Sequence, residues 1–276
     1  MLKTAIAIPA GKLNEALKSL QGMPDIPSLA CDASDFEDEQ TANLLAENGI
    51  RCPLLMNLTP DDTIAALETA EATHATSLFY KNIFSIMTLA AAQNGADAFS
   101  LPLRLDRIPE NVWQNEMSRI VSSLEDFLDA PMPNHFSCLL PVRFPKTFPG
   151  SEELARSLAL CKAVNQAYHT KHAYSSIQAS LDILAIIYPD EEMPKGHRVT
   201  PDTFRENDLL SSVKALMFNF QPAAGETLFD DEQMEWAAFL KESSFDGTVI
   251  FNPVGCSAHE MPAIYGDIAE WMKYYL

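Results

Sequence analysis

The chain has 276 residues, 47% of them apolar and 21% charged, so it can fill a sizeable core and is not a disordered protein. Its 38 acidic and 19 basic side chains give a net charge of −19 with no basic run, which argues against a nucleic-acid partner. No apolar run reaches the roughly 18 residues of a membrane span. Five scattered cysteines suit reduced thiols, so we expect a cytoplasmic protein that does not enter the membrane.

Short apolar segments alternate with helical segments along the chain. The predicted strands are Lys3–Pro9, Ile26–Cys31, Arg51–Leu58, Asp97–Leu103, His135–Val142, Ile177–Ile183, one that starts at Val213 and one that ends at Asn252-Pro253. The predicted helices are Lys12–Leu20, Phe36–Glu47, a long stretch from Thr59 to Asn94, Pro109–Asp129, Ser151–Gln166, one between the last two strands and one after Ser257–Glu260, which is a capping box.

Eight strands in alternation with helices favour an α/β protein of the (β/α)8 TIM barrel type, with residues 1–276 forming a single domain. The unit from Val213 to Gly255 shows the repeat most clearly, as strand, polar loop, amphipathic helix and strand. A doubly wound open sheet is the alternative, and it requires a glycine-rich turn after an early strand. Ala10-Gly11-Lys12 is the one candidate for that turn and has a single glycine.

Three segments resemble the xylose isomerase-like TIM barrel superfamily, the sugar phosphate isomerase/epimerase group. Ala90–Ala98 is similar to a helix-to-strand passage of that group, Leu181-Asp182-Ile183 resembles its sixth strand, and Lys241–Val249 resembles its approach to strand eight. The resemblance implies a sugar isomerase or epimerase that moves a proton on its substrate. In the family, a divalent metal usually polarises the carbonyl and hydroxyl of the sugar.

The resemblance also implies four metal ligands, and most are missing here. The family uses Glu at the end of strand five, Asp ending strand six, His on strand seven and Glu ending strand eight. Asp182 matches the second ligand, whereas Leu140–Arg143 holds no Glu and Asn252 replaces the last one. Because one carboxylate with amides makes a poor site for Mn²⁺ or Zn²⁺, we expect no metal and no other cofactor.

Polar residues near the predicted strand ends are the candidate site, since a barrel keeps its active site at the carboxyl ends of its strands. We predict Asp182 as the catalytic base, and Asn219, Gln221, Asn252, Arg143 and Arg104 as substrate-binding residues. Each has a structural alternative: the amides and Asp182 could cap loops, and the arginines could pair with nearby acids. The carboxylates that could replace the missing acids are Asp32, Asp35 and Asp106.

The sequence thus favours a divergent sugar isomerase/epimerase-like barrel that acts on a small sugar or polyol by proton transfer, with a degraded metal site. The competing hypothesis is a barrel without catalysis that binds a ligand or forms a complex. The missing acids at strands five and eight favour the competing hypothesis, whereas a substitute carboxylate would favour the enzyme. A small sugar-like ligand is the expected partner, and the sequence leaves a homo-oligomer open.

Overall fold

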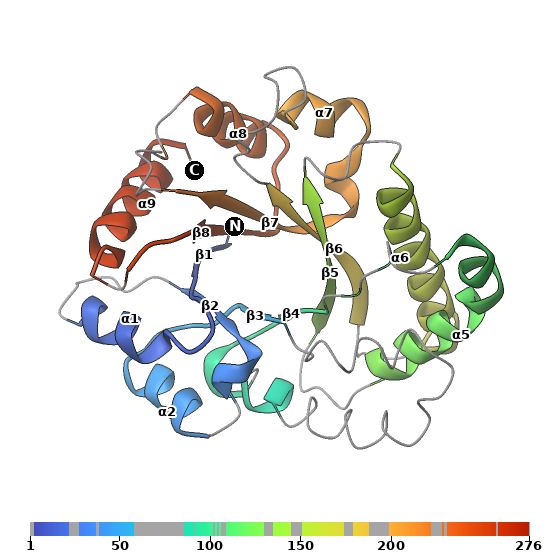
Figure 1. The fold of residues 1–276 in the computed structure, drawn as a ribbon, viewed down its shortest axis with the longest axis horizontal. Helices are drawn as coiled ribbons and strands as arrows, with labels where there is room; N and C mark the ends of the chain where they lie inside the picture. The colour runs from blue at the N-terminus through green and yellow to red at the C-terminus, as the bar shows by residue number, and fades with distance from the viewer. Residues whose placement is uncertain are drawn as a thin grey trace.

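Eight parallel strands form a closed barrel in chain order, and β1 pairs with β8 to complete it (Figure 1). This confirms the (β/α)8 prediction and excludes the open sheet. The structure is a computed structural model that describes the chain apart from residues 1–2, 22–27, 37–38, 58–85, 91, 102, 104, 106–108, 130–134, 145–150, 174–178, 188–198, 222–227, 229–230, 258 and 276.

The strands and helices follow one another around the barrel. The strands are β1 Lys3–Ala7, β2 Leu29–Asp32, β3 Leu54–Met56, β4 Ala98–Ser100, β5 Phe136–Phe144, β6 Ala179–Ile187, β7 Val213–Phe220 and β8 Thr248–Pro253. The α-helices labelled in Figure 1 are α1 Leu13–Leu20, α2 Glu39–Glu47, α5 Glu110–Leu128, α6 Glu152–Lys171, α7 Pro201–Glu206, α8 Asp231–Glu242 and α9 Met261–Tyr275. Two short 3₁₀ turns, η1 Ala33–Phe36 and η4 Leu209–Ser212, follow β2 and precede β7.

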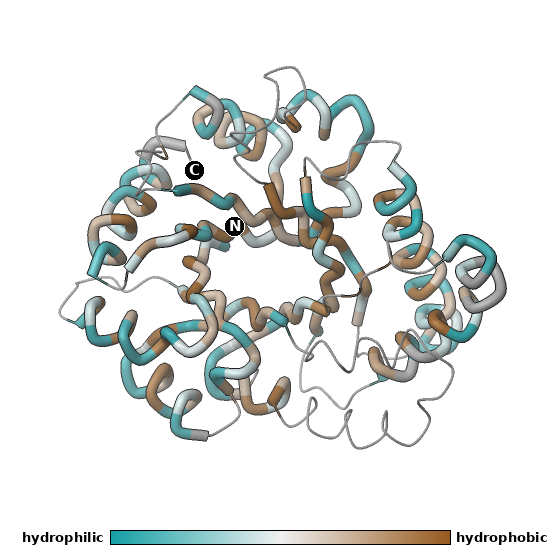
Figure 2. The backbone as a smooth tube through the Cα atoms, in the orientation of Figure 1, coloured by the Kyte–Doolittle hydropathy of each residue, from teal (hydrophilic) through white to brown (hydrophobic). Residues whose placement is uncertain are grey.

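The strands bury apolar side chains on both faces, because helices cover the outside and other strands enclose the inside. Figure 2 shows brown, hydrophobic segments along the strands of the barrel. Side chains on the outer face pack against the helices in one large core. Side chains on the inner face form a separate cluster of 11 buried residues, five of them alanine. The members of this inner cluster are Ala5, Ala7, Ala30, Leu54, Ala98, Leu139, Leu184, Ile186, Ala215, Met217 and Ile250.

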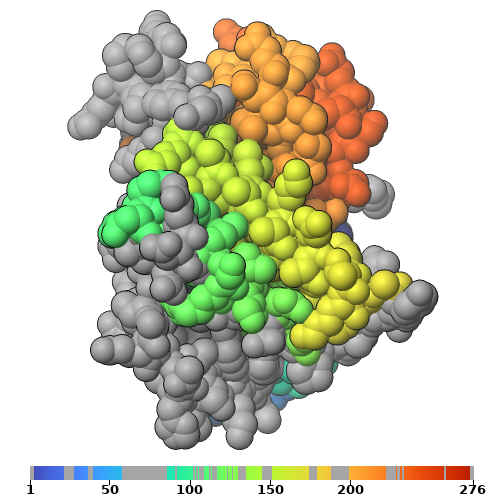
Figure 3. All heavy atoms as spheres, turned by 90° about the vertical axis from the view of Figure 1, so that its right-hand side faces the viewer, coloured from blue at the N-terminus to red at the C-terminus, as the bar shows by residue number. Residues whose placement is uncertain are grey.

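The predicted helix signals are present where the structure describes them. Ser151 accepts a hydrogen bond from the backbone N–H of Leu154 at 3.3 Å and so caps α6. Before α9, the Glu260 carboxylate accepts from the backbone N–H and the hydroxyl of Ser257, each at 2.8 Å. Figure 3 shows α5 (green) against α6 (yellow-green) on one outer face. No helix in the described part of the chain is long and apolar enough to cross a membrane.

The sixth strand differs from its prediction in a way that matters for the site. It was expected over Ile177–Ile183 and is observed as Ala179–Ile187. The apolar run Ile183–Ile187 continues the strand because β6 pairs residue by residue with the whole of β5. Asp182 therefore lies five residues before the end of β6 rather than beside it.

Candidate functional site

The inner face of the barrel is apolar in the middle and carries polar side chains at the carboxyl ends of several strands. Alternate residues of a strand share a face, so each residue two positions after a member of the inner cluster also faces inward. The inward-facing polar residues that this rule gives at the carboxyl end are Asp32, Ser100, Asn219 and Asn252. Arg143 shares the same face because it lies four positions after Leu139. Four of these five were predicted, three as site residues and Asp32 as a substitute acid, and Ser100 is the exception.

Asn219 and Asn252 form a direct contact between β7 and β8. They are register partners, and Asn252 Nδ2 donates a hydrogen bond to Asn219 Oδ1 at 2.7 Å. Asn219 is 4% exposed, whereas Asn252 is partly open. The amide nitrogen of Asn219 and the amide oxygen of Asn252 have no hydrogen-bond partner among the described residues. The pair therefore keeps one donor and one acceptor for a ligand.

A second network joins the ends of β2, β3 and β4. Asp32, which is 9% exposed, accepts from the backbone N–H of Ser34 at 3.0 Å, from the Ser34 hydroxyl at 2.6 Å and from Asn57 Nδ2 at 2.8 Å. Asn57 also donates its backbone N–H to Ser100 Oγ at 2.9 Å. No ion pair to Asp32 exists in the part of the chain that the structure describes. Buried carboxylates are usually paired with a cation, so Asp32 is a functional candidate.

Asp35 lies three residues further on, in η1, and its pKa is raised. Burial raises the pKa of Asp35, the backbone hydrogen bond from Gly11 (3.0 Å) opposes this, and the negative charge of Asp32 adds to the rise. The second carboxylate oxygen, Oδ2, is shut away from solvent with no hydrogen-bond partner among the described residues. A raised pKa makes a carboxyl group a better proton acceptor than an ordinary aspartate.

Asp182 was expected at the barrel mouth, and the structure places it elsewhere. It faces inward from the amino-terminal half of β6, and Ser180 Oγ donates to its Oδ2 at 2.6 Å. It lines a hollow with Ser212 and Val213, where β7 begins. Asp182 and Asn252 thus lie at opposite ends of the barrel, and the expectation that they share a site is wrong.

The remaining predicted residues divide into two groups. Arg143 is exposed at the penultimate position of β5, on the inward-facing side with Leu139. Gln221 follows β7 directly and is exposed, with an interaction of its own. Arg104 and Asp106 lie outside the described residues. The structure therefore brings Arg143, Asn219 and Asn252 to one end and leaves Asp182 at the other.

Sequence reasoning missed Asn57 and Ser100 as site residues. Ser100 ends β4, but the predicted strand ran on to Leu103 and hid it in the interior. Asn57 has a positive φ of 52°, a conformation that asparagine tolerates better than most residues. A polar residue at the end of a short apolar strand was the signal in both cases.

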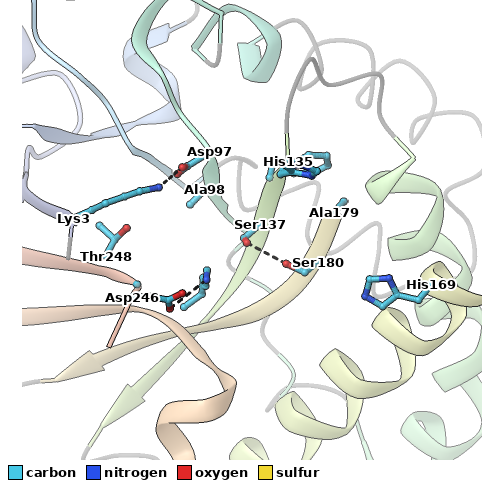
Figure 4. A pocket seen from close by; sticks show the side chains of 13 residues that line it. Lys3, Asp97, Ala98, His135, Ser137, His169, Ala179, Ser180, Asp246 and Thr248 are labelled. Carbon is cyan, nitrogen blue, oxygen red and sulfur yellow. Dashed lines mark hydrogen bonds and ion pairs between the residues drawn. The ribbon is translucent and has the colours of Figure 1, made fainter. Parts of the chain in front are cut away.

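A polar cavity lies at the amino-terminal end of the barrel (Figure 4), on the far side from the mouth. It has a volume of about 380 Å³ and is lined in part by Lys3, Ser137, Ser180 and Thr248. The neighbouring hollow that contains Asp182 has about 630 Å³ and shares Ser180 and Lys214 with it.

The described residues do not fit the divalent metal that the family resemblance implies. The last inward-facing residues of β5, β7 and β8 are Arg143, Asn219 and Asn252, which offer no anionic oxygen and no imidazole. Among the residues that the structure describes, no three His, Cys, Asp or Glu side chains lie close enough to hold a metal ion.

The cysteines are also poor candidates for chemistry. All five are free, and four of them are buried. Burial, with a smaller contribution from the charge of Asp182, raises the pKa of Cys161 to about 12. The thiolate is the reactive form of cysteine, so a thiol of this kind is inert at neutral pH.

Comparison with known proteins finds similarity in structure and none in sequence. No family model matches the chain, and no curated protein matches its sequence. Among solved structures it is similar to L-ribulose 3-epimerase, with 9% identity and a TM-score of 0.63 over 100% of this chain and 96% of that one. It is also similar to a xylose isomerase domain protein from Alicyclobacillus acidocaldarius, with 12% identity and a TM-score of 0.61 over 99% of each chain.

A third similar structure is D-psicose 3-epimerase from Clostridium cellulolyticum H10 with D-tagatose. Its identity is 13% and its TM-score 0.56, over 98% of this chain and 92% of that one. At such identities the similarity concerns the fold and not the chemistry. The chain therefore shares the (β/α)8 fold of these structures.

Proposed function

We propose that the carboxyl end of the barrel binds a small sugar or polyol. The observation that carries the proposal is the Asn219–Asn252 pair, whose Asn219 amide nitrogen and Asn252 amide oxygen have no hydrogen-bond partner among the described residues. A sugar hydroxyl both donates and accepts, as an amide does, so the two match without any charge. The fold relatives support this choice, since they include epimerases of L-ribulose and D-psicose.

Isomerisation by proton transfer is the second candidate, and the raised pKa of Asp35 favours it. In such a reaction a carboxylate removes the proton from the carbon beside the ketone, and the electron pair of that C–H bond moves toward the carbonyl oxygen. The same carboxyl group then returns the proton to the former carbonyl carbon, while the hydroxyl proton of the first carbon passes to the former carbonyl oxygen and a new carbonyl forms there. In this proposal the Asn219 amide nitrogen and the Arg143 guanidinium stabilise the negative oxygen.

A binding assay tests the first proposal. L-Ribulose, D-fructose and D-tagatose are titrated by calorimetry into the wild-type chain and into Asn252→Ala. We expect at least one ketose to bind, and its affinity to fall about tenfold in the variant, since a lost hydrogen bond to an uncharged ligand group is worth about 0.5–1.5 kcal/mol. If no ketose or matching alditol binds, or if Asn252→Ala binds equally well, the proposal is wrong.

Solvent deuterium separates the two functions. The ketose that binds is incubated with the protein in D₂O, and NMR follows loss of the C–H signal beside the carbonyl. Exchange that disappears in Asp35→Asn supports the isomerase. Binding without exchange instead supports a ligand-binding barrel, and exchange that persists in Asp35→Asn excludes Asp35 as the acid–base group.

A further inference from the structure

The cavity at the amino-terminal end of the barrel is built from inward-facing polar side chains where an apolar layer would be the ordinary filling. Lys3, Ser137, Ser180 and Thr248 each lie two positions from an inner-cluster residue or from Asp182, on the same face of their strands. In Figure 4 Lys3 reaches across the space toward Asp97, with Thr248 beside it and the two serines opposite. The volume of about 380 Å³ suits a small molecule.

The hydrogen bonds between the hydroxyl groups on one wall have a defined donor and acceptor. Ser180 Oγ donates its hydrogen to Asp182 Oδ2 at 2.6 Å, so it cannot also donate to Ser137. The 3.1 Å contact between the two serines must therefore run from Ser137 to Ser180. As a result, Ser137 presents oxygen lone pairs to the cavity, and this wall accepts a hydrogen bond from a ligand.

The opposite wall carries donors. Thr248 on β8 pairs with Lys3 on β1 and with Ala215 on β7. Lys214 directly precedes Ala215. The Thr248 hydroxyl has no hydrogen-bond partner among the described residues. Two ammonium groups and a hydroxyl thus come together from three adjacent strands.

The present partners of the two lysines are weakly held. Lys3 pairs with Asp97 and Lys214 with Asp246, the latter at 3.6 Å, and all four side chains are at least 40% exposed. Exposed ion pairs contribute little, so a bound anion could replace either carboxylate at small cost. The net charge of −19 repels anions at long range, but salt screens charges beyond about 8 Å at physiological ionic strength. The attraction of the two nearby lysines therefore dominates the binding of an anion in the cavity.

We propose that this cavity is a second ligand site, which takes a small carboxylate with a hydroxyl or ammonium group beside it. The carboxylate lies between Lys3 and Lys214 and accepts from the Thr248 hydroxyl. The neighbouring hydroxyl or ammonium donates to Ser137 Oγ. The site is separate from the sugar site at the other end of the barrel.

Three probes of similar size test whether the carboxylate and the hydroxyl group of the ligand are each needed for binding. Lactate has both groups, propionate lacks the hydroxyl, and 1,2-propanediol lacks the carboxylate. Each is titrated into the ¹⁵N-labelled full chain, and the amide signals of Ser137 and Thr248 are followed. We expect lactate to bind about tenfold more tightly than either of the others, as one lost hydrogen bond to a polar or charged partner implies. Equal binding of lactate and propionate, or of lactate and the diol, would overturn the proposal, as would no shift with lactate.

Matched variants assign the contacts. Ser137→Ala should remove the preference for lactate over propionate, whereas Ser137→Thr keeps an acceptor oxygen and should retain it. Lys214→Gln should weaken lactate about tenfold, and Lys241→Gln, exposed on α8 and outside the cavity, should not. Asn252→Ala should leave lactate binding unchanged. An unaltered preference in Ser137→Ala, or equal losses in the two lysine variants, would contradict the assignment.

Discussion

Asn252 Nδ2 lies 2.7 Å from Asn219 Oδ1, and this one hydrogen bond joins the last two strands of the barrel at their carboxyl ends. Both side chains are amides, so the contact holds the strand ends together without placing a charge there. The barrel mouth thus has a neutral side at β7 and β8 and an acidic side at β2, where Asp32 and Asp35 lie.

Removal of the Asn252 amide should cost stability as well as ligand binding. In Asn252→Ala the nearly buried Asn219 oxygen loses its donor, so we expect the free energy of unfolding to fall by about 1–3 kcal/mol. Urea denaturation measures the difference. Asn207→Ala is the control, because its amide bonds to the Thr203 carbonyl on the exposed end of α7 and should matter less. Equal losses in the two variants would contradict the buried contact.

Asp35→Asn should make the protein more stable at neutral pH. Burial and the charge of Asp32 raise the pKa of Asp35 in the folded state, so between its unfolded and folded pKa values the folded chain binds more protons. Stability contributed by this group is therefore highest at low pH and falls as pH rises through that window.

The test is urea denaturation of wild type and Asp35→Asn at pH 7 and at pH 3, below the usual aspartate pKa of about 3.9. The advantage of the variant should be present at pH 7 and absent at pH 3. Asp267→Asn, exposed on α9, should show no such pH dependence. A variant that is equally stable or less stable at pH 7 would mean that another contact holds the carboxylate in place.

Gly247 should not tolerate alanine. A Cβ at this position would lie 2.3 Å from the Lys214 carbonyl oxygen and 2.3 Å from Phe245 Cζ. Overpacking of this kind costs about 1–3 kcal/mol. Gly266→Ala on α9 is the matched control: a Cβ there meets nothing within 4 Å, so helix propensity should stabilise the chain by up to about 1 kcal/mol. Thermal unfolding of the two variants should shift in opposite directions.

Asp182→Asn should leave the carboxyl end of the barrel unaffected. Asp182 lies five residues before the end of β6, roughly 16 Å along the strand at 3.3 Å per residue. Ketose binding and deuterium exchange should therefore equal those of the wild type. The variant should instead change lactate binding, because an amide in place of the carboxylate can reverse the hydrogen bond with Ser180. Lost ketose binding in a folded Asp182→Asn would restore Asp182 to the sugar site.

The fold was predictable because its signals are local and repeated. Strands apolar on both faces, separated by helix caps such as Ser151, give the alternation of a barrel without knowledge of any contact. The end of β6 was not predictable in this way. Its extension to Ile187 depends on pairing with β5, and an apolar run alone does not say where a strand stops.

The site was predictable only where a polar side chain ends a strand. Asn219 and Asn252 were predicted near the ends of their strands, and both lie there. The link from Asn57 to Asp32 depends on a left-handed turn at Asn57 and on the neighbouring register of β2 and β3, which are properties of the folded chain. The position of Asp182 was predicted from its match to a family motif. That match does not say how far along β6 the residue lies, which depends on where the strand ends.

One face of strand β8 contacts both proposed ligands. Thr248 lies at the start of the strand, Asn252 near its end, and buried Ile250 between them. The two polar residues are four positions apart, roughly 13 Å along an extended strand. A ligand that shifts β8 along its axis at one end must shift it at the other, so the affinities for the carboxylate and the sugar would be coupled, and by the same factor in both directions. The backbone amide of Ile250, distant from both ligands, would sense such a movement directly.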